Sequence, residues 1–394
     1  TIYIIISVFE KMDDEKLLPK RCATDFFQKY FQAGQKTSIA LASHPPSSLD
    51  LFMANNRKLI ALLSPTLFVY TIYWLLAYHY AFYTLFATKW EMAAVMVFGG
   101  IVGGATAEGG GAVAFPVMTL LLKIPPTVAR DFSVMIQTVG LNSAACSIHM
   151  MDLVIEKHTL IFGTIGGSFG TILCLENLDI VIPAAHKKII FVSVFFSFAV
   201  ALFILNKEKK RETRDIIHDF GFQDALILLG AGFIGGIFSG LAGTGLEVFC
   251  FSVITLLYRI NEKVATSTTI SLAGLNSAVS FFWRYHMQNA IEPLAWEYFA
   301  VCVPMVALFA PFGSFISSFL HRQTLAFFIY VLETVALISA FVILRPPPLL
   351  WILSLIIILI TCTFYQFLSS VGKRLMHAES EKKLRPLLDV SFVV

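Results

Sequence analysis

The sequence GGIVGGATAEGGGAVAFP at residues 99–116 lies inside an apolar part of the chain, yet it holds seven glycines, one carboxylate and a closing proline. Glycine loses more backbone freedom on folding than any other residue, so this density would weaken a regular membrane helix. Glycines do allow helices to pack closely, and they allow a chain to break and reverse where it lines a cavity enclosed by protein. A helix broken in this way directs free N–H groups and the positive end of its dipole into the cavity, which predicts an anion site.

A second glycine-rich sequence, GAGFIGGIFSGLAGTGLE at residues 230–247, has the same character. Other short sequences repeat as well. TLLLKI at 119–124 is matched by TLLYRI at 255–260, and GLNSA occurs at both 140–144 and 274–278. Two interrupted apolar segments in corresponding halves of a chain indicate the substrate site of a transporter.

The composition is that of a membrane protein. The chain is 57% hydrophobic and 14% charged, with a mean hydropathy of +0.76, whereas soluble domains carry about a quarter charged residues. The six cysteines stand alone without CxxC spacing, which favours a role as small apolar packing residues. No His, Cys and carboxylate cluster has metal-ligand spacing and no Walker motif is present, so we expect no metal, no cofactor and no ATP drive within this chain.

The predicted fold is all-α and polytopic, with two inverted repeats, each a Gly-rich re-entrant hairpin plus three transmembrane helices, and one extra helix at each end. Within the repeats, we expect the spans at residues 132–151, 159–176, 188–205, 266–284, 294–320 and 325–344. The expected order is a polar N-terminal tail at 1–58, a first transmembrane helix at 59–87, repeat one at 91–206, a charged cytosolic loop at 207–223, repeat two at 224–344, a last transmembrane helix at 349–370 and a basic C-terminal tail at 371–394.

The distribution of positive charge favours the re-entrant version of the two Gly-rich segments. If both segments return to the side from which they start, 22 of the 29 Lys and Arg residues lie on the side of the N-terminal tail and seven on the other. If both crossed fully, the densest basic loop would lie outside, against the positive-inside rule. Re-entry also leaves three crossings in each repeat, an odd number, so the two copies are inverted and both tails are cytosolic.

The chain resembles the sulfite exporter TauE/SafE family of membrane permeases. The resemblance rests on GGATAEGGGAVAFPVMTLLLKIPPTVARDFSVMIQTVGLNSAA at residues 103–145 and on its second copy at 230–278. It implies a permease that moves sulfite, sulfonates or related small anions across a membrane. The implied partners are a small anionic substrate and the lipid bilayer, with no nucleic acid, and the sequence indicates no oligomeric state.

Backbone N–H groups of the two broken segments are the best candidates to bind the anion, because a transported anion needs donors that do not trap it. Amide and hydroxyl groups nearby, including Gln137 and Thr138, would add further donors. The predicted substrate-binding residues are Gly109, Gly110, Gly111, Asn142, Ser143, Gly243, Gly245, Asn276, Ser277 and Thr268. For every one of them, helix packing through small residues is the alternative interpretation.

Four cations bracket the turns after the Gly-rich segments. Lys123 and Arg130 in one copy, and Arg259 and Lys263 in the other, would form an electrostatic funnel at each mouth, on opposite faces. The alternatives are ordinary interfacial anchoring and, for Arg130, a local ion pair with Asp131.

Two carboxylates, Glu108 and Glu247, lie in the Gly-rich segments. Carboxylates in apolar membrane segments are costly and commonly functional, so both are candidates for proton coupling. The alternative is that each is a structural cap bonded to N–H groups. Glu333 is also expected within a span and has no partner that the sequence reveals.

The function that follows is movement of a small anion, sulfite or a related sulfur oxyanion or organosulfonate, by alternating access of the two repeats. An anion-selective channel using the same hairpins is the alternative, and a non-transporting membrane scaffold is a third.

The GGSFG sequence at 166–170 fits the nucleophile-elbow pattern of serine hydrolases, but it lies in an apolar helical run rather than a strand–turn–helix. We therefore expect no enzyme.

Overall fold

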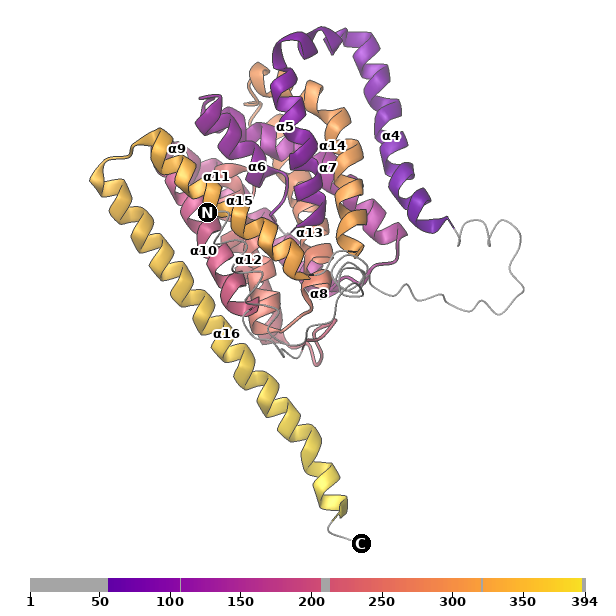
Figure 1. The fold of residues 1–394 in the computed structure, drawn as a ribbon, viewed down its shortest axis with the longest axis vertical. Coiled ribbons are helices and arrows are strands. Elements are labelled where there is room, and N and C mark those ends of the chain that lie inside the picture. The colour runs from indigo at the N-terminus through magenta and orange to yellow at the C-terminus, as the bar shows by residue number, and fades with distance from the viewer. Residues whose placement is uncertain (1–55, 107, 207–212, 320–321, 392–394) are drawn as a thin grey trace, which may run out of the picture.

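The computed structural model describes residues 56–391 except 107, 207–212 and 320–321, so almost all of the predicted N-terminal tail lies outside the described residues. The structure is 86% helical, and the described residues contain no strand. The chain is an integral, multi-pass membrane protein with an all-α fold (Figure 1).

The first half contains α4 (Arg57–Tyr80), the 3₁₀ turn η1 (Phe82–Leu85), α5 (Phe86–Ala105), α6 (Gly111–Pro116), the π-helical turn η2 (Val117–Leu121), α7 (Pro126–Met150), α8 (Lys157–Leu173), the π-helical turn η3 (Cys174–Leu178), α9 (Asp179–Val181) and α10 (Ala184–Asn206). The second half contains α11 (Phe222–Ala242), α12 (Leu246–Ser252), the π-helical turn η4 (Val253–Leu257), α13 (Glu262–Phe282), the π-helical turn η5 (Trp283–Met287), α14 (Pro293–Phe319), α15 (Arg322–Leu344) and α16 (Pro348–Ser391).

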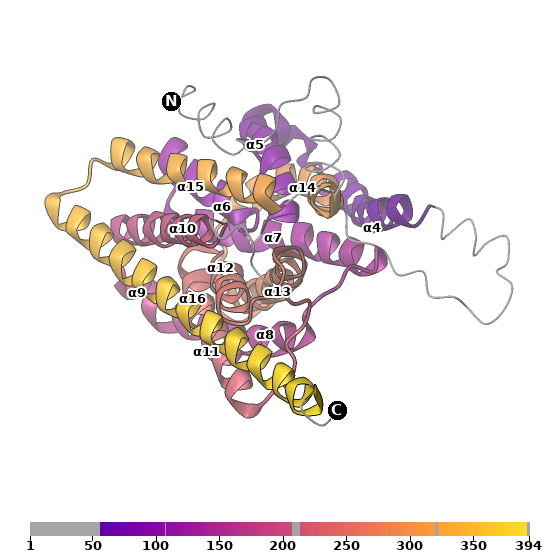
Figure 2. The ribbon, with the colours of Figure 1, turned by 60° about the horizontal axis from the view of Figure 1, so that its bottom comes forward.

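Eight helices of the described chain are long and apolar enough to cross a membrane, and six of them coincide with expected spans. Phe82–Ala105 and Phe222–Ala242, the first arms of the two Gly-rich segments, qualify. The helices α7 and α13, which cover the expected spans 132–151 and 266–284, do not. Most of their residues are buried, and Figures 1 and 2 show both among the other helices, with α4, α15 and α16 outside. Their polar side chains therefore face protein rather than lipid.

Both Gly-rich segments are broken helices whose two arms run antiparallel. A Cβ atom added to Gly103 of α5 would lie 3.0 Å from Cα of Gly110, and one added to Gly99 would lie 3.7 Å from Cβ of Val113. In the second segment, a Cβ atom on Gly235 of α11 would lie 2.7 Å from Cα of Leu246. The chain thus reverses direction at each break.

The two reversed segments also end in the same way. Lys123 after η2 and Arg259 after η4 both have φ of 57°. The next residue donates the same backbone hydrogen bond in each copy, from Ile124 N to Met118 O and from Ile260 N to Ile254 O, at 2.9 Å in both. The sequence similarity between 119–124 and 255–260 therefore corresponds to a shared local backbone structure.

Each glycine-rich helix packs against a helix from the other half of the chain. Carbon atoms of Ala310 on α14 lie 2.7 and 3.1 Å from the place where a Cβ atom of Gly104 would stand, so α5 and α14 meet at backbone distance. In the same way, a Cβ atom on Gly170 of α8 would lie 2.9 Å from the carbonyl carbon of Phe233 on α11, and one on Gly236 would lie 2.9 Å from Gly167. The GGSFG sequence is thus a helix-packing surface.

The ends of two helices differ from the sequence predictions. The first expected span ran to residue 87, but α4 ends at Tyr80 because Ala81 adopts left-handed backbone geometry with φ of 51°. The expected C-terminal tail is not separate from the last span, since α16 continues as one helix from Pro348 to Ser391. The residues after 370 include four Leu, three Lys, two Arg and two Glu, which favour helix.

Two groups of charged residues lie at opposite ends of α10. This helix has 23 residues and is about 34 Å long. At the start of α10, Lys187 pairs with Asp179, and Lys188 donates to the carbonyl of Thr119 at 2.9 Å. We call this the Asp179 end. Beyond the other end of α10, the backbone of Arg214 donates a hydrogen bond to residue 259 and accepts one from residue 261. We call this the Asn206 end, after the last residue of α10.

Candidate functional site

The two helix breaks meet inside the protein. The hydroxyl of Thr244, in the second break, lies 3.0 Å from the carbonyl oxygen of Glu108 in the first, and it also hydrogen-bonds the carboxyl group of Glu247. Gln137 on α7 donates from Nε2 to the carbonyl oxygen of Gly243 at 2.8 Å. A Cβ atom on Gly109 would lie 2.9 Å from both Gln137 Oε1 and Glu247 Oε1. Residues from three distant parts of the chain are therefore in contact at one buried site.

Glycine makes these breaks possible. Gly109, Gly243 and Gly245 have φ of 71°, 81° and 140°, in the region that side-chain-bearing residues avoid. The helices α6 and α12 begin directly after them, at Gly111 and Leu246, so each directs its N-terminal end toward the contact between the breaks.

The two carboxylates proposed for proton coupling have different surroundings. Glu247 receives the Thr244 hydroxyl and lies beside the backbone N–H groups of Gly245 and of its own residue, so it caps the start of α12. Glu108 is fully buried, and neither of its carboxyl oxygens has a hydrogen-bond donor among the described residues. The cap interpretation fits Glu247 and does not fit Glu108.

Two small cavities lie near the first break, one of them beside its contact with Gln137. One, of about 10 Å³, is lined by Gly103, Gly110, Gln137, Gly140 and apolar side chains, and it has room for about one water molecule. The other, of about 20 Å³, is lined by residues that include Thr106, Asn206 and Lys263. An oxyanion with four heavy atoms exceeds either cavity, so its binding at the breaks requires the helices to separate.

The predicted polar donors outside the breaks are hydrogen-bonded to neighbouring helices or within their own helix. Asn142 joins α7 to α13 by donating to the carbonyl of Gly274 at 2.8 Å, and Asn276 joins α13 to α8 by donating to Thr171 Oγ1 at 3.3 Å. The hydroxyl of Thr268 accepts from Glu156 N at 2.8 Å. Ser143 and Ser277 donate to carbonyls in their own helices, each at 2.7 Å. These five residues have packing and tethering roles in the structure.

The four cations predicted at the mouths lie in pairs at opposite ends. Lys123 is exposed next to η2, and Arg130 follows on α7, both toward the Asp179 end. Arg259 is buried and donates to the carbonyl of Ser369 at 3.3 Å, and Lys263 lines the 20 Å³ cavity at the Asn206 end. Arg130, at 1% exposure, does not face a solvent mouth.

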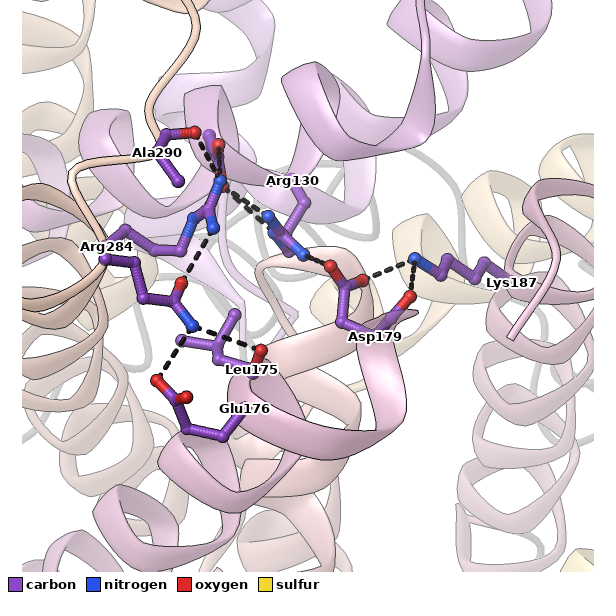
Figure 3. Close-up of polar contacts among 9 residues, drawn as sticks. Arg130, Leu175, Glu176, Asp179, Lys187, Arg284 and Ala290 are labelled. Carbon is purple, nitrogen blue, oxygen red and sulfur yellow. Dashed lines mark hydrogen bonds and ion pairs between the residues drawn. The ribbon is translucent and has the colours of Figure 1, made fainter. Parts of the chain in front are cut away.

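Arg130 belongs to a buried ion-pair network that sequence analysis did not find (Figure 3). Its guanidinium donates to Asp131 Oδ1 at 2.9 and 3.0 Å and pairs with Asp179, which also pairs with Lys187. Arg284, from η5, donates to both carboxyl oxygens of Asp131, at 2.9 and 2.6 Å. The ion pair held as the alternative for Arg130 is therefore present, as part of a larger network.

The network ties together the Asp179 ends of several helices. Arg284 also donates to Gln288 Oε1 and to the carbonyl of Ala290, both at 2.7 Å, and Gln288 in turn donates to Glu176 Oε1 at 2.9 Å (Figure 3). A signal for it was present in the sequence. Charges in apolar helices need partners, and Arg130, Asp131 and Arg284 were three such charges of mixed sign.

Comparison with known proteins identifies the family of the chain. No curated protein and no solved structure matches the chain. The family model described as "Sulfite exporter TauE/SafE" matches residues 92–341, which begin in α5 and end in α15 and so include both helix breaks. This match covers more than half of the chain, and the protein therefore belongs to the sulfite exporter TauE/SafE family of membrane transporters.

Proposed function

We propose that this protein carries sulfite, or a closely related sulfur oxyanion or organosulfonate, through a site formed where the two helix breaks meet. Membership of the family establishes transport of sulfite or a related anion across a membrane, not enzymatic catalysis. The choice among these anions and the mechanism are our inference from the geometry.

The contact between the breaks is the observation that carries the proposal. Two helix N-termini, those of α6 and α12, begin there beside the amide group of Gln137. N–H groups and helix dipoles attract an anion without the permanent trap that a buried cation would create. Gly109, Gly110, Gly111, Gly243 and Gly245 are the backbone positions that we propose for binding.

Alternating access of two inverted repeats is the mechanism that we propose for this site. It is supported by the matching turns after η2 and η4 and by the exchange of packing partners, in which α5 packs on α14 and α11 on α8. In this mechanism the repeats rock about the closed contact and expose it in turn to the Asp179 end and the Asn206 end. We propose that the Asn206 end is cytosolic, since it carries the dense basic loop.

Reconstitution into liposomes tests this function against the channel alternative. Purified protein should exchange radiolabelled sulfite inside the vesicles for unlabelled sulfite outside, and protein-free vesicles should not. Sulfate, thiosulfate, taurine and chloride, tested as competitors, should rank the anions that the site accepts. A channel would instead give an electrical conductance, and unlabelled sulfite outside the vesicles would not stimulate the efflux of labelled sulfite. That result, or exchange of chloride alone, would contradict the proposal.

A further inference from the structure

The helix α15 has one buried stripe, and that stripe carries a carboxylate. Ala326, Ile329, Glu333 and Ala340 are buried at helical spacing, and Glu333 is only 1% exposed. Residues on the other faces, such as Val335 at 56%, are exposed on the outside of the helix layer. An apolar side chain at position 333 would pack against the neighbouring helices equally well. Packing therefore does not explain the carboxylate.

Glu333 lies against Glu108, the unbonded carboxylate of the first helix break. Thr106, two residues before Glu108, and Ile329, one helical turn before Glu333, line the same 20 Å³ cavity, and the two carboxyl groups are within hydrogen-bonding reach of each other. Both Glu108 oxygens and Glu333 Oε2 nevertheless lack a donor among the described residues. The closeness of the two carboxyl groups and the lack of a donor are compatible, because an ionised carboxylate only accepts hydrogen bonds. Two ionised carboxylates therefore cannot form a hydrogen bond with each other. A proton on one carboxyl group supplies the missing donor.

The charges around the pair do not replace this proton. Glu247 of α12 is the other titratable group that acts on Glu108, and a carboxyl group there can be negative or neutral but never positive. No ion pair between described residues includes Glu108 or Glu333. Two buried like charges side by side are strongly unfavourable, so such a pair retains at least one proton.

The 20 Å³ cavity lies near the pair, on the side of the Asn206 end. Ile329, one helical turn before Glu333, and Thr106, two residues before Glu108, line its inner side. Asn206, Glu262 and Lys263 line it at the Asn206 end, and the hydroxyl of Tyr330 accepts a hydrogen bond from Asn206 at 2.9 Å. The cavity has room for one or two water molecules next to polar groups that can exchange protons with them.

We propose that Glu108 and Glu333 form the proton site that couples anion transport to a proton gradient. This inference rests on the proposed function. A carboxyl O–H bond breaks when the proton passes to water in the cavity, and it forms again when water returns a proton to the carboxylate. Because Glu108 belongs to the first break, loss of the proton leaves two facing negative charges beside the anion site and drives the break away from α15. Glu247 stays the cap of α12.

Two measurements on the purified full-length protein test the proton site. The first is uptake of labelled sulfite into proteoliposomes driven by a pH gradient, with protein-free vesicles to subtract passive movement, beside sulfite counterflow without a gradient. We expect Glu333→Gln to lower gradient-driven accumulation by about tenfold or more while counterflow persists, and Glu108→Gln to lower gradient-driven accumulation as well. The matched control is Glu297→Gln on α14, where the carboxylate is exposed and pairs with Lys89. It should leave both activities at the wild-type level.

The second measurement is the infrared C=O band of a protonated carboxyl group at neutral pH. We expect the band in the wild-type protein, and we expect Glu108→Gln and Glu333→Gln, but not Glu297→Gln, to shift or weaken it. Absence of the band from the wild-type protein would overturn the proton site whether or not the variants fold. Undiminished gradient-driven accumulation in Glu333→Gln would overturn it too, as would drive by sodium in place of protons. Failure of wild-type counterflow would refute the proposed function, and the band would still decide the state of the pair.

Discussion

We expect Asp131→Asn to lower the free energy of unfolding by about 3–5 kcal/mol, because it removes the shared anion of a buried network. Asp131 is 1% exposed and accepts hydrogen bonds from both Arg130 and Arg284. The neutral amide leaves Arg284 with only the neutral groups of Gln288 and Ala290 as partners in the described chain, and it leaves Arg130 with Asp179, which Lys187 shares. The loss should also loosen the Asp179 ends of α7, α9, α10 and η5, which the network joins (Figure 3).

An exposed ion pair in the same protein gives the matched control. Asp152 pairs with Arg57 at 3.6 Å, and their side chains are 52% and 40% exposed. Asp152→Asn should therefore change the free energy of unfolding by less than about 1 kcal/mol. Thermal unfolding of both variants in one detergent, followed by size-exclusion chromatography, compares them directly. Equal midpoints for the two variants would contradict the structural role of the network.

Gly243→Ala should abolish transport, with a loss of about 100-fold or more, because it displaces the helix break by atomic distances. Gly243 has φ of 81°, and an added Cβ atom would lie 2.7 Å from both the carbonyl oxygen of Arg130 and Cβ of Ser133. These atoms belong to the buried helix α7, which cannot move without disturbing Gln137 and the ion-pair network. The second break would therefore lose its position against the first.

Gly230→Ala, on the same helix α11, is the matched control. A Cβ atom on Gly230 meets nothing within 4 Å. Alanine is also a better helix former than glycine, so this variant should be at least as stable as the wild-type protein. Sulfite counterflow by Gly230→Ala should stay within about twofold of the wild-type rate. Equal counterflow by the two variants would show that the break tolerates displacement, against our interpretation.

The glycine-rich segments were predictable because local chemistry decides them. Seven glycines and Pro116 weaken a helix wherever they occur, and the helices do end at Ala105 and Ala242, before new helices begin at Gly111 and Leu246. The family resemblance rested on the same residues, and the match at 92–341 confirms it. The end of α4 was not predictable, because the apolar and aromatic residues continue past Ala81 without a helix-breaking residue.

Partners far apart in the chain account for most of what the sequence did not reveal. Gln137 bonds Gly243 across 106 residues, and Asp131 bonds Arg284 across 153. Hydrophobic periodicity reports on one helix at a time and does not indicate which other helix covers it. For the same reason the sequence does not reveal that other helices cover α7 and α13, or that Glu333 lies beside Glu108.

The most direct measurement of the central claim is an experimental structure of the protein in saturating sulfite. Our account predicts that the anion lies where the breaks meet, within hydrogen-bonding distance of the Gln137 amide and of N–H groups at the starts of α6 and α12. The contact between Thr244 and the Glu108 carbonyl, 3.0 Å in the closed structure, should then be open. Sulfite bound elsewhere, with that contact unchanged, would contradict the claim.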